Sequence, residues 1–119
     1  MTSNEHPHTP AWFDISTPDA PRARRFYQEM FGWPVNVIDE TYALVGDDHG
    51  RPAGGIGHAG PGSPYTGFVA YFRVDDVDAA LASAEKLGGT RVMEPTDTPT
   101  GRIAAFADPD GNPVGLLSS

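Results

Sequence analysis

The fold is decided by residues 12–35, which read WFDISTPDAPRARRFYQEMFGWPV, together with residues 69–92, which read VAYFRVDDVDAALASAEKLGGTRV. The two stretches align without a gap, so that Asp19 meets Asp76. Few residues are identical, but the apolar positions and the turn residues agree in kind, which indicates a structural duplication. We therefore expect two copies of one supersecondary unit that share a core.

Each copy begins as a strand and continues as an amphipathic helix. Apolar and polar side chains alternate over residues 12–17, which is strand periodicity. Asp19 is typical of a helix N-cap, and apolar residues recur at helical spacing until Gly32, which suits a left-handed C-cap. Strand-like stretches follow in both copies, apart from residues 95–101, which predict a loop. The order is thus strand, helix, strand, strand, strand, used twice.

The two modules form one domain in this interpretation. They cover about residues 11–58 and 67–117, within a single domain of residues 10–119. Glycine, proline and serine are concentrated in residues 59–66, which predict the linker between the modules. Residues 1–9 are polar and predict a flexible tail.

Composition excludes several classes of function. The chain of 119 residues has no cysteine, so it has no disulfide framework, thiolate metal site or cysteine nucleophile. Its net charge of -8 argues against nucleic acid and anionic lipid as partners. No apolar run is long enough to span a membrane, and no secretory signal is recognised. We therefore expect a cytoplasmic protein that contacts neither nucleic acid nor membrane.

Short motifs occur in a fixed order along the chain. They are Asp19, Phe26-Tyr27, Phe31-Gly32-Trp33, Val74-Asp75-Asp76-Val77 and Asp108-Pro109-Asp110-Gly111-Asn112. In this order and spacing, over about residues 11–117, the chain resembles the vicinal oxygen chelate superfamily of glyoxalases, bleomycin-resistance proteins and extradiol dioxygenases. The resemblance implies an α+β fold of two βαβββ modules, whose curled mixed sheets surround a cup and carry the helices on their outer face.

Enzymes of that superfamily hold a metal ion on the first and last strands of each module. The resemblance places these ligand positions on Trp12, Gly54, Val69 and Gly115. None of these residues offers the carboxylate, imidazole or thiolate that a metal site needs. The chain thus resembles the scaffold of the family while departing from its catalytic pattern, and we expect neither a metal ion nor another cofactor.

Alternation along the strands sorts the side chains into a helix-facing set and a cup-facing set. Phe13 and Ile15 are expected to face the first helix. The candidate ligand-binding residues of the cup are Trp12, Asp14, Gly54, His58, Val69, Tyr71, Arg73 and Gly115. This lining is aromatic and apolar with a few polar groups, which is the composition of a small-molecule pocket.

Each candidate also has a structural interpretation. Trp12 either stacks on a ligand or plugs the cup. Asp14 binds a ligand cation, acts as a general base, or is a carboxylate hydrogen-bonded to a neighbouring strand. For Tyr71, Arg73 and His58 the alternatives are a packed tyrosine, a salt bridge at the rim and a solvated histidine. The glycines either leave room for a ligand or mark bulges.

Three classes of function stay open at this point. The first is a metal-free protein that binds or sequesters an aromatic or cationic compound, as in the bleomycin-resistance branch. The second is a lyase or isomerase with an atypical site that uses Asp14, Tyr71 or His58. The third is a protein-interaction module with a filled cup. The absent metal ligands and the negative charge favour the first, and the resemblance further implies a homodimer.

Overall fold

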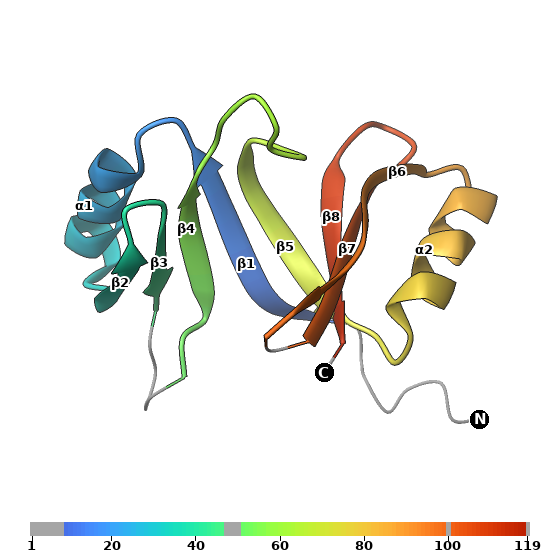
Figure 1. Ribbon diagram of the computed structural model, residues 1–119, viewed down its shortest axis with the longest axis horizontal. Helices are drawn as coiled ribbons and strands as arrows, with labels where there is room; N and C mark the ends of the chain where they lie inside the picture. The colour runs from blue at the N-terminus through green and yellow to red at the C-terminus, as the bar shows by residue number, and fades with distance from the viewer. Residues whose placement is uncertain (1–8, 47–50, 100, 119) are drawn as a thin grey trace. The chain divides into compact units, whose positions relative to one another are not determined.

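The computed structural model describes residues 9–46, 51–99 and 101–118, which fall into two compact units (Figure 1). The first unit is Trp12–Phe68, and the second is built on Val69–Ser119. The elements in chain order are β1 (Pro10–Thr17), α1 (Ala20–Phe31), β2 (Val35–Asp39), β3 (Tyr42–Val45), β4 (Gly54–His58), β5 (Gly67–Arg73), α2 (Val77–Lys86), β6 (Thr90–Thr98), β7 (Gly101–Ala107) and β8 (Pro113–Ser118). The α+β class and the order strand, helix, strand, strand, strand in both halves are confirmed.

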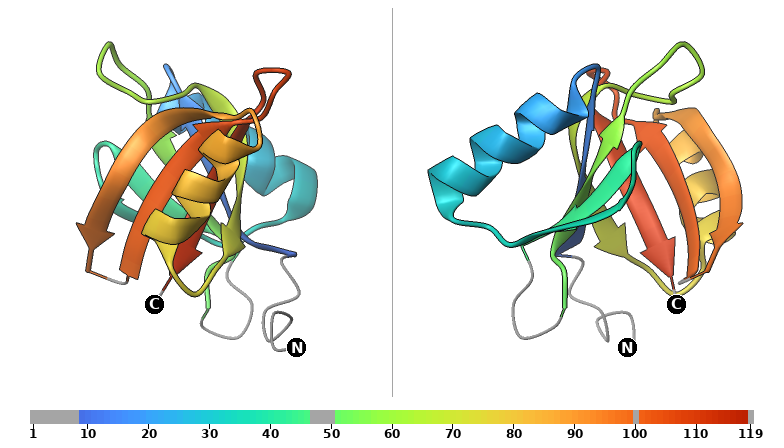
Figure 2. Two further views of the ribbon diagram at one scale, coloured as in Figure 1. Left: turned by 90° about the vertical axis from the view of Figure 1, so that its right-hand side faces the viewer. Right: turned by 60° about the vertical axis from the view of Figure 1, so that its left-hand side comes forward.

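The first unit is a mixed sheet with the strand order β2-β3-β4-β1. β1 and β4 are parallel, while β3 is antiparallel to both β2 and β4. α1 covers one face of this sheet (Figure 2). The buried cluster beneath it is Ile15, Ala20, Val45 and Ile56, with Phe13, Ala23, Tyr27, Trp33 and Val35 packed around it. Each large aliphatic side chain buried there contributes roughly 1.5–3 kcal/mol, and Phe13 and Ile15 face the helix as the alternation predicts.

α1 begins and ends where the sequence predicts. The carboxylate of Asp19 accepts a hydrogen bond from the backbone N–H of Arg22 at 3.1 Å, which satisfies a donor of the first turn. Gly32 ends the helix with a φ of 68°, a left-handed conformation that glycine adopts without a steric penalty. Its N–H donates to the carbonyl of Gln28 at 2.8 Å and closes the last turn.

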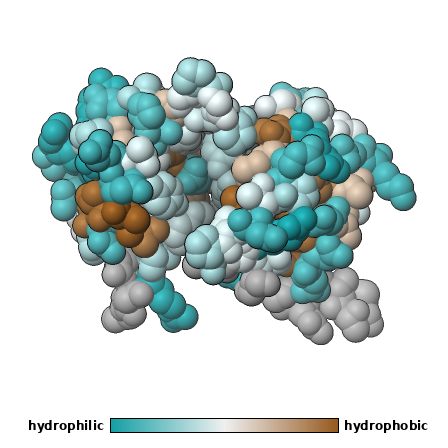
Figure 3. Space-filling model, viewed as in Figure 1, coloured by the Kyte–Doolittle hydropathy of each residue, from teal (hydrophilic) through white to brown (hydrophobic). Residues whose placement is uncertain are grey.

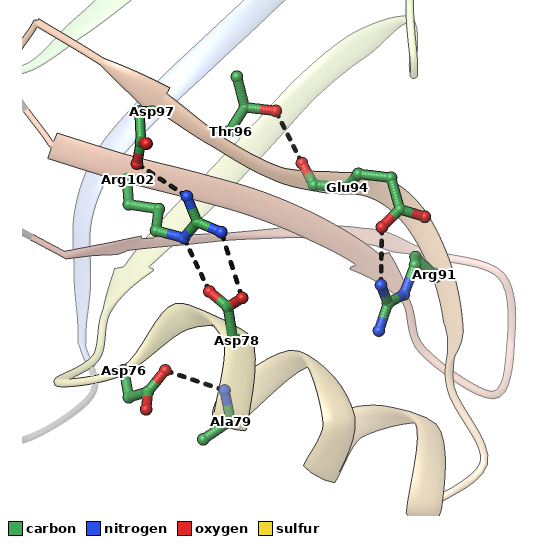
Figure 4. Close-up of polar contacts among 8 residues, drawn as sticks. All are labelled: Asp76, Asp78, Ala79, Arg91, Glu94, Thr96, Asp97 and Arg102. Carbon is green, nitrogen blue, oxygen red and sulfur yellow. Dashed lines mark hydrogen bonds and ion pairs between the residues drawn. The ribbon is translucent and has the colours of Figure 1, made fainter.

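The second unit repeats this plan with the strand order β5-β8-β7-β6. β5 and β8 are parallel, and the other two pairs are antiparallel. Asp76 is the N-cap of α2, because its carboxylate accepts from the N–H of Ala79 at 3.1 Å (Figure 4). The buried cluster between α2 and the sheet is Val77, Leu81, Ala104 and Leu116.

The structure corrects the loop predicted at residues 95–101. β6 runs through most of this stretch and pairs with β7 in an antiparallel ladder. The pairing is interrupted by register shifts, one of which lies between Met93 and Thr96 and takes up Pro95. A bulge in a strand at the end of its sheet tolerates a proline, which has no N–H to donate, so the strand continues where composition alone indicates a loop.

A polar network at the surface joins α2 to the strands beside it (Figure 4). Arg102 of β7 donates to both carboxylate oxygens of Asp78 on α2, from Nε at 2.7 Å and from Nη2 at 3.2 Å. Its Nη1 donates to Asp97 of β6 at 2.8 Å. The arginine thus connects three elements of the second unit through one planar guanidinium group.

The stretches between and before the modules contain no regular elements in the described part of the chain. Residues 59–66, the predicted linker, form turns and irregular backbone and belong to the first unit. The predicted tail, residues 1–9, lies outside the described residues except for Thr9.

Within the described ranges, no helix has the length and hydropathy needed to cross a membrane.

Candidate functional site

Two tyrosine hydroxyls hold the carboxylate of Asp14 in the first unit. Tyr65 donates from its hydroxyl to Oδ2 of Asp14 at 3.0 Å. Tyr42 donates a second hydrogen bond to the same carboxylate. The three residues come from β1, β3 and the stretch between β4 and β5, so the site is assembled from segments that are distant in the sequence.

Strand register explains how Tyr42 reaches Asp14 across β4. Asp14 pairs with Gly55 in the parallel ladder of β1 and β4, and β3 lies on the other side of β4. A Cβ atom added to Gly55 would collide with the ring and hydroxyl of Tyr42. Because Gly55 has no side chain, the tyrosine lies flat over β4 and extends to the next strand. The Asp14 site therefore depends on a glycine that makes no polar contact of its own with the carboxylate.

The surroundings of Asp14 perturb its protonation. Burial raises the pKa of this carboxyl above its ordinary value of 3.8, and the hydrogen bonds from Tyr65 and Tyr42 oppose the rise without cancelling it. The group lies on the sheet face opposite α1, since its neighbour Ile15 packs into the cluster beneath the helix. A half-buried carboxylate with a raised pKa is able to hold a proton or to pair with a cation.

The candidate residues of the second module share one face of their own sheet. Tyr71 pairs with Gly115, and the tyrosine ring lies where a Cβ of Gly115 would stand. The next residue, Leu116, packs against α2, so Gly115 and Tyr71 face the opposite way. Val69 and Arg73 have the same parity on β5, and Val69 and Tyr71 are buried. The ring of Tyr71 is thus packed against Gly115.

Gly54 and His58 do not join Asp14. Gly54 pairs with Phe13, and its missing side chain makes room for the phenyl ring on the face that α1 covers. His58 has the same parity at the end of β4 and is exposed. The resemblance gives Gly54 the position in the first module that Gly115 has in the second, but the strand registers, in which Asp14 pairs with Gly55 as Tyr71 pairs with Gly115, assign that position to Gly55. A slip of one residue moves a side chain to the other face of a strand, and two adjacent glycines conceal the slip.

Trp12 lies two residues before Asp14 on β1, on the same face, and is half-buried.

Tyr42 and Tyr65 are the site residues that the sequence analysis missed. Tyr65 lies in a linker-like stretch and is 51 positions from Asp14, so no local pattern connects them. The alternating Gly55 and Gly57 were the available signal for Tyr42, because glycines in a strand often admit an aromatic ring from the adjacent strand.

The residues present do not fit the metal ion of the resembled enzymes. Trp12, Val69 and Gly115 offer no donor atom, and neither Gly54 nor Gly55 does so on β4. Within residues 9–46, 51–99 and 101–118, no group of three or more His, Cys, Asp or Glu side chains could hold a metal ion. The chemistry of this site therefore has to be derived from Asp14 and its tyrosines.

Comparisons with known proteins agree on one family. Residues 9–116 match the family model described as the Glyoxalase/Bleomycin resistance protein/Dioxygenase superfamily. The chain is 35% identical over 123 residues to the anthracycline biosynthesis protein DnrV of Streptomyces peucetius, covering 88% of this chain and 45% of that protein. It is 33% identical over 117 residues to CFP32 of Mycobacterium tuberculosis, covering 91% of this chain and 44% of that protein. The name of CFP32 carries a provisional glyoxylase assignment. The chain thus spans less than half the length of these relatives.

Solved structures share the fold at lower sequence identity. The Mn(II)-bound glyoxalase of Novosphingobium aromaticivorans superposes with a TM-score of 0.67 and 22% identity, over 93% of this chain and 39% of that one. An extradiol ring-cleaving dioxygenase of B. fuscum superposes with a TM-score of 0.66 and 21% identity, over 92% and 32%. At this identity the likeness extends to the fold alone.

Proposed function

Because the chain belongs to the glyoxalase/bleomycin resistance protein/dioxygenase superfamily, we propose that it binds a small aromatic or cationic compound, without a metal ion, at Asp14. One observation carries the proposal. The half-buried carboxylate of Asp14 is held by the hydroxyls of Tyr42 and Tyr65 on the sheet face opposite α1. Two hydrogen bonds orient the carboxylate before a ligand arrives, so little orientational freedom is lost on binding.

The chemistry around Asp14 selects the kind of ligand. Burial disfavours the charged form of the Asp14 carboxylate. A ligand that is a cation or a strong hydrogen-bond donor compensates this cost. The rings of Tyr42, Tyr65 and Trp12 offer flat surfaces for stacking and for cation–π contact, each contributing on the order of 1 kcal/mol. The cup of the family, and ligand-binding roles for Val69, Tyr71, Arg73 and Gly115, remain predictions of the resemblance within this proposal.

The test of this function is a binding titration with a fluorescent anthracycline, chosen because the relative DnrV is named for anthracycline biosynthesis. The expected result is saturable binding that Asp14→Asn weakens at least about tenfold, since a charge-assisted hydrogen bond contributes roughly 1.5–3 kcal/mol. Asp110→Asn removes the same charge from an exposed turn and is the matched control. Equal affinity of the two variants for every compound in a broad screen would contradict the proposal.

The same site also supports a second candidate function. A carboxyl with a raised pKa beside two phenols is suited to proton transfer, as in a lyase or isomerase reaction, with Asp14 as the general base. The provisional name of CFP32 favours this alternative. Turnover that Asp14→Asn abolishes, in protein shown by elemental analysis to lack a divalent metal, would establish it. About one zinc, nickel or iron per chain would contradict the metal-free site in both versions.

A further inference from the structure

A groove of about 420 Å³ opens in the first unit, away from Asp14. It is formed by the end of β1, the first half of α1 and residues 66–68. Ile15, which packs beneath α1, forms part of its wall, whereas Asp14 points to the other face of the strand. The volume lies in the range of small-molecule pockets. The proposed Asp14 site does not use this groove.

The walls of the groove are aromatic and their orientation is set by neighbouring rings. Phe68 stacks on Phe13 with centroids 5.2 Å apart and an interplanar angle of 14°. Phe26 meets Tyr27 edge-on, with centroids 5.0 Å apart and an angle of 89°. Yet Phe26 and Phe68 remain 59% and 57% exposed. Rings that are oriented by packing but still face solvent offer a planar ligand a preformed surface.

Arg22 is the charged residue that lines this groove. Its Nε lies 3.7 Å from Oδ2 of Asp19, an exposed and long ion pair, with side-chain exposures of 72% and 47%. Its two terminal nitrogens donate no hydrogen bond to a residue that the structure describes. A guanidinium group presents these nitrogens as a planar fork that matches a carboxylate. The groove thus combines aromatic walls with a cation whose ion pair with Asp19 is long and exposed.

This chemistry is not required by the fold. The internal alignment places Ala79 and Ser83 of α2 where α1 has Arg22 and Phe26. Neither Arg22 nor Phe26 belongs to the residues that pack α1 on its sheet, so the contacts given for the core do not depend on them. In addition, Arg22, Arg24 and Arg25 are three of the 8 Lys and Arg residues in a chain of net charge -8. The start of α1 is therefore locally basic on an acidic protein, which favours an anion.

From these contacts we propose that the groove is a second ligand site, which binds a planar aromatic carboxylate. The ring lies against Phe26 and Phe68, and the carboxylate accepts two hydrogen bonds from Arg22. This ligand differs in charge from the one proposed for Asp14, because a carboxylate repels an anion. The two sites are independent, and the failure of either does not bear on the other.

The probe for this site is 2-naphthoate, titrated into the full chain by calorimetry and followed residue by residue in amide NMR spectra. We expect saturable binding that shifts the amide signals of residues 15–17, 22–27 and 66–68. Arg22→Gln should weaken it about tenfold or more, the effect of losing a charge-assisted pair. The neutral 2-naphthamide should bind weakly and equally to the parent chain and to Arg22→Gln.

Three controls keep the result interpretable. Arg25→Gln removes the same charge from the same helix outside the groove lining, and Asp14→Asn tests the other site. Both should leave the affinity for 2-naphthoate within about threefold. Equal losses in Arg22→Gln and Arg25→Gln, shifts centred on Asp14 and Tyr42, or no saturation at millimolar 2-naphthoate would each overturn the proposal. Unchanged circular dichroism confirms that the exposed substitutions preserve the fold.

Discussion

Gly55 is the residue through which the Asp14 site is most easily tested. Substitution by alanine places a methyl group where the ring and hydroxyl of Tyr42 lie. We expect Gly55→Ala to displace the tyrosine from Asp14 and to lower the free energy of unfolding by about 1–3 kcal/mol. Gly62→Ala, which meets no atom within 4 Å, is the matched control and should be near neutral.

A double-mutant cycle measured by urea unfolding separates this mechanism from general crowding. Tyr42→Phe should destabilise the parent chain by about 1 kcal/mol, because it removes the hydroxyl that Asp14 accepts from. In the Gly55→Ala background, where the contact is already lost, Tyr42→Phe should have almost no effect. Additive losses would show that Tyr42 keeps its place despite the new methyl group.

The raised pKa of Asp14 predicts an unusual pH dependence of stability. The folded protein holds this proton more tightly than the unfolded chain, so the contribution of Asp14 to stability falls as pH rises from 3.8 through the raised pKa and is constant above it. Asp14→Asn does not titrate. In urea unfolding from about pH 3 to about pH 7, the variant should therefore gain stability relative to the parent as pH rises.

Asp108 supplies a control of opposite sign. Hydrogen bonds from the side chain and backbone of Asn112 lower the pKa of its carboxyl. Its stabilisation is present above pH 3.8 and is lost as pH falls through the lowered pKa. Asp108→Asn should therefore lose stability relative to the parent as pH rises. Parallel slopes in the two aspartate variants would contradict the raised pKa of Asp14.

At the scale of elements, Arg102 tests how α2 is attached to the neighbouring strands. Its hydrogen bonds to Asp78 hold the pKa of that carboxyl below its ordinary value. Arg102→Met should lower the melting temperature by a few degrees at neutral pH, and by less in 1 M salt because the network is exposed. This decrease in melting temperature should vanish as pH falls below 3.8 through the lowered pKa of Asp78, because protonated Asp78 no longer forms an ion pair with Arg102. A loss that is independent of salt and pH would assign the effect to the alkyl chain of Arg102.

At the scale of the whole molecule, exposed apolar residues predict a homodimer. Figure 3 shows apolar side chains gathered over β2, beside α1. Outside the groove, the exposed large apolar residues of these elements are Met30, Phe31, Val37 and Ile38, with exposures of 51–64%. Such a patch marks an interaction surface more often than a solvated face. Sedimentation velocity at tens of micromolar should therefore detect a dimer, as the resemblance also implies.

Charge substitutions show whether this patch forms the dimer interface. Ile38→Lys should shift the protein to a monomer, because dimer formation would remove the lysine ammonium from water without giving it an ion-pair partner. Leu87→Lys introduces the same charge at a residue that is 81% exposed in the other unit and should leave the dimer intact. A monomeric parent chain, or dissociation by both substitutions alike, would contradict the prediction.

The sequence by itself determined the features that depend on short-range chemistry. The order of elements in both modules follows from hydrophobic periodicity, and the ends of α1 follow from Asp19 and Gly32. The direction of Phe13 and Ile15 toward the helix follows from strand alternation. Each of these signals lies within a few residues of the position it describes, so no knowledge of distant contacts was needed. Asp14 was likewise chosen as a candidate from its inward position between aromatic residues, and its binding role stays a prediction.

Only the tertiary structure decided which residues surround Asp14 and where the groove beside α1 opens. The ladder of β1 and β4 places Gly55 beside Asp14 and turns Gly54 to the helix, a distinction of one residue that two adjacent glycines hide. Tyr65 reaches Asp14 from 51 positions away. The groove brings Arg22 and Phe68 together from different ends of the first unit. Strand register and long-range packing depend on the burial of many side chains at once. These side chains come from all parts of the chain, so no local stretch of sequence predicts the result.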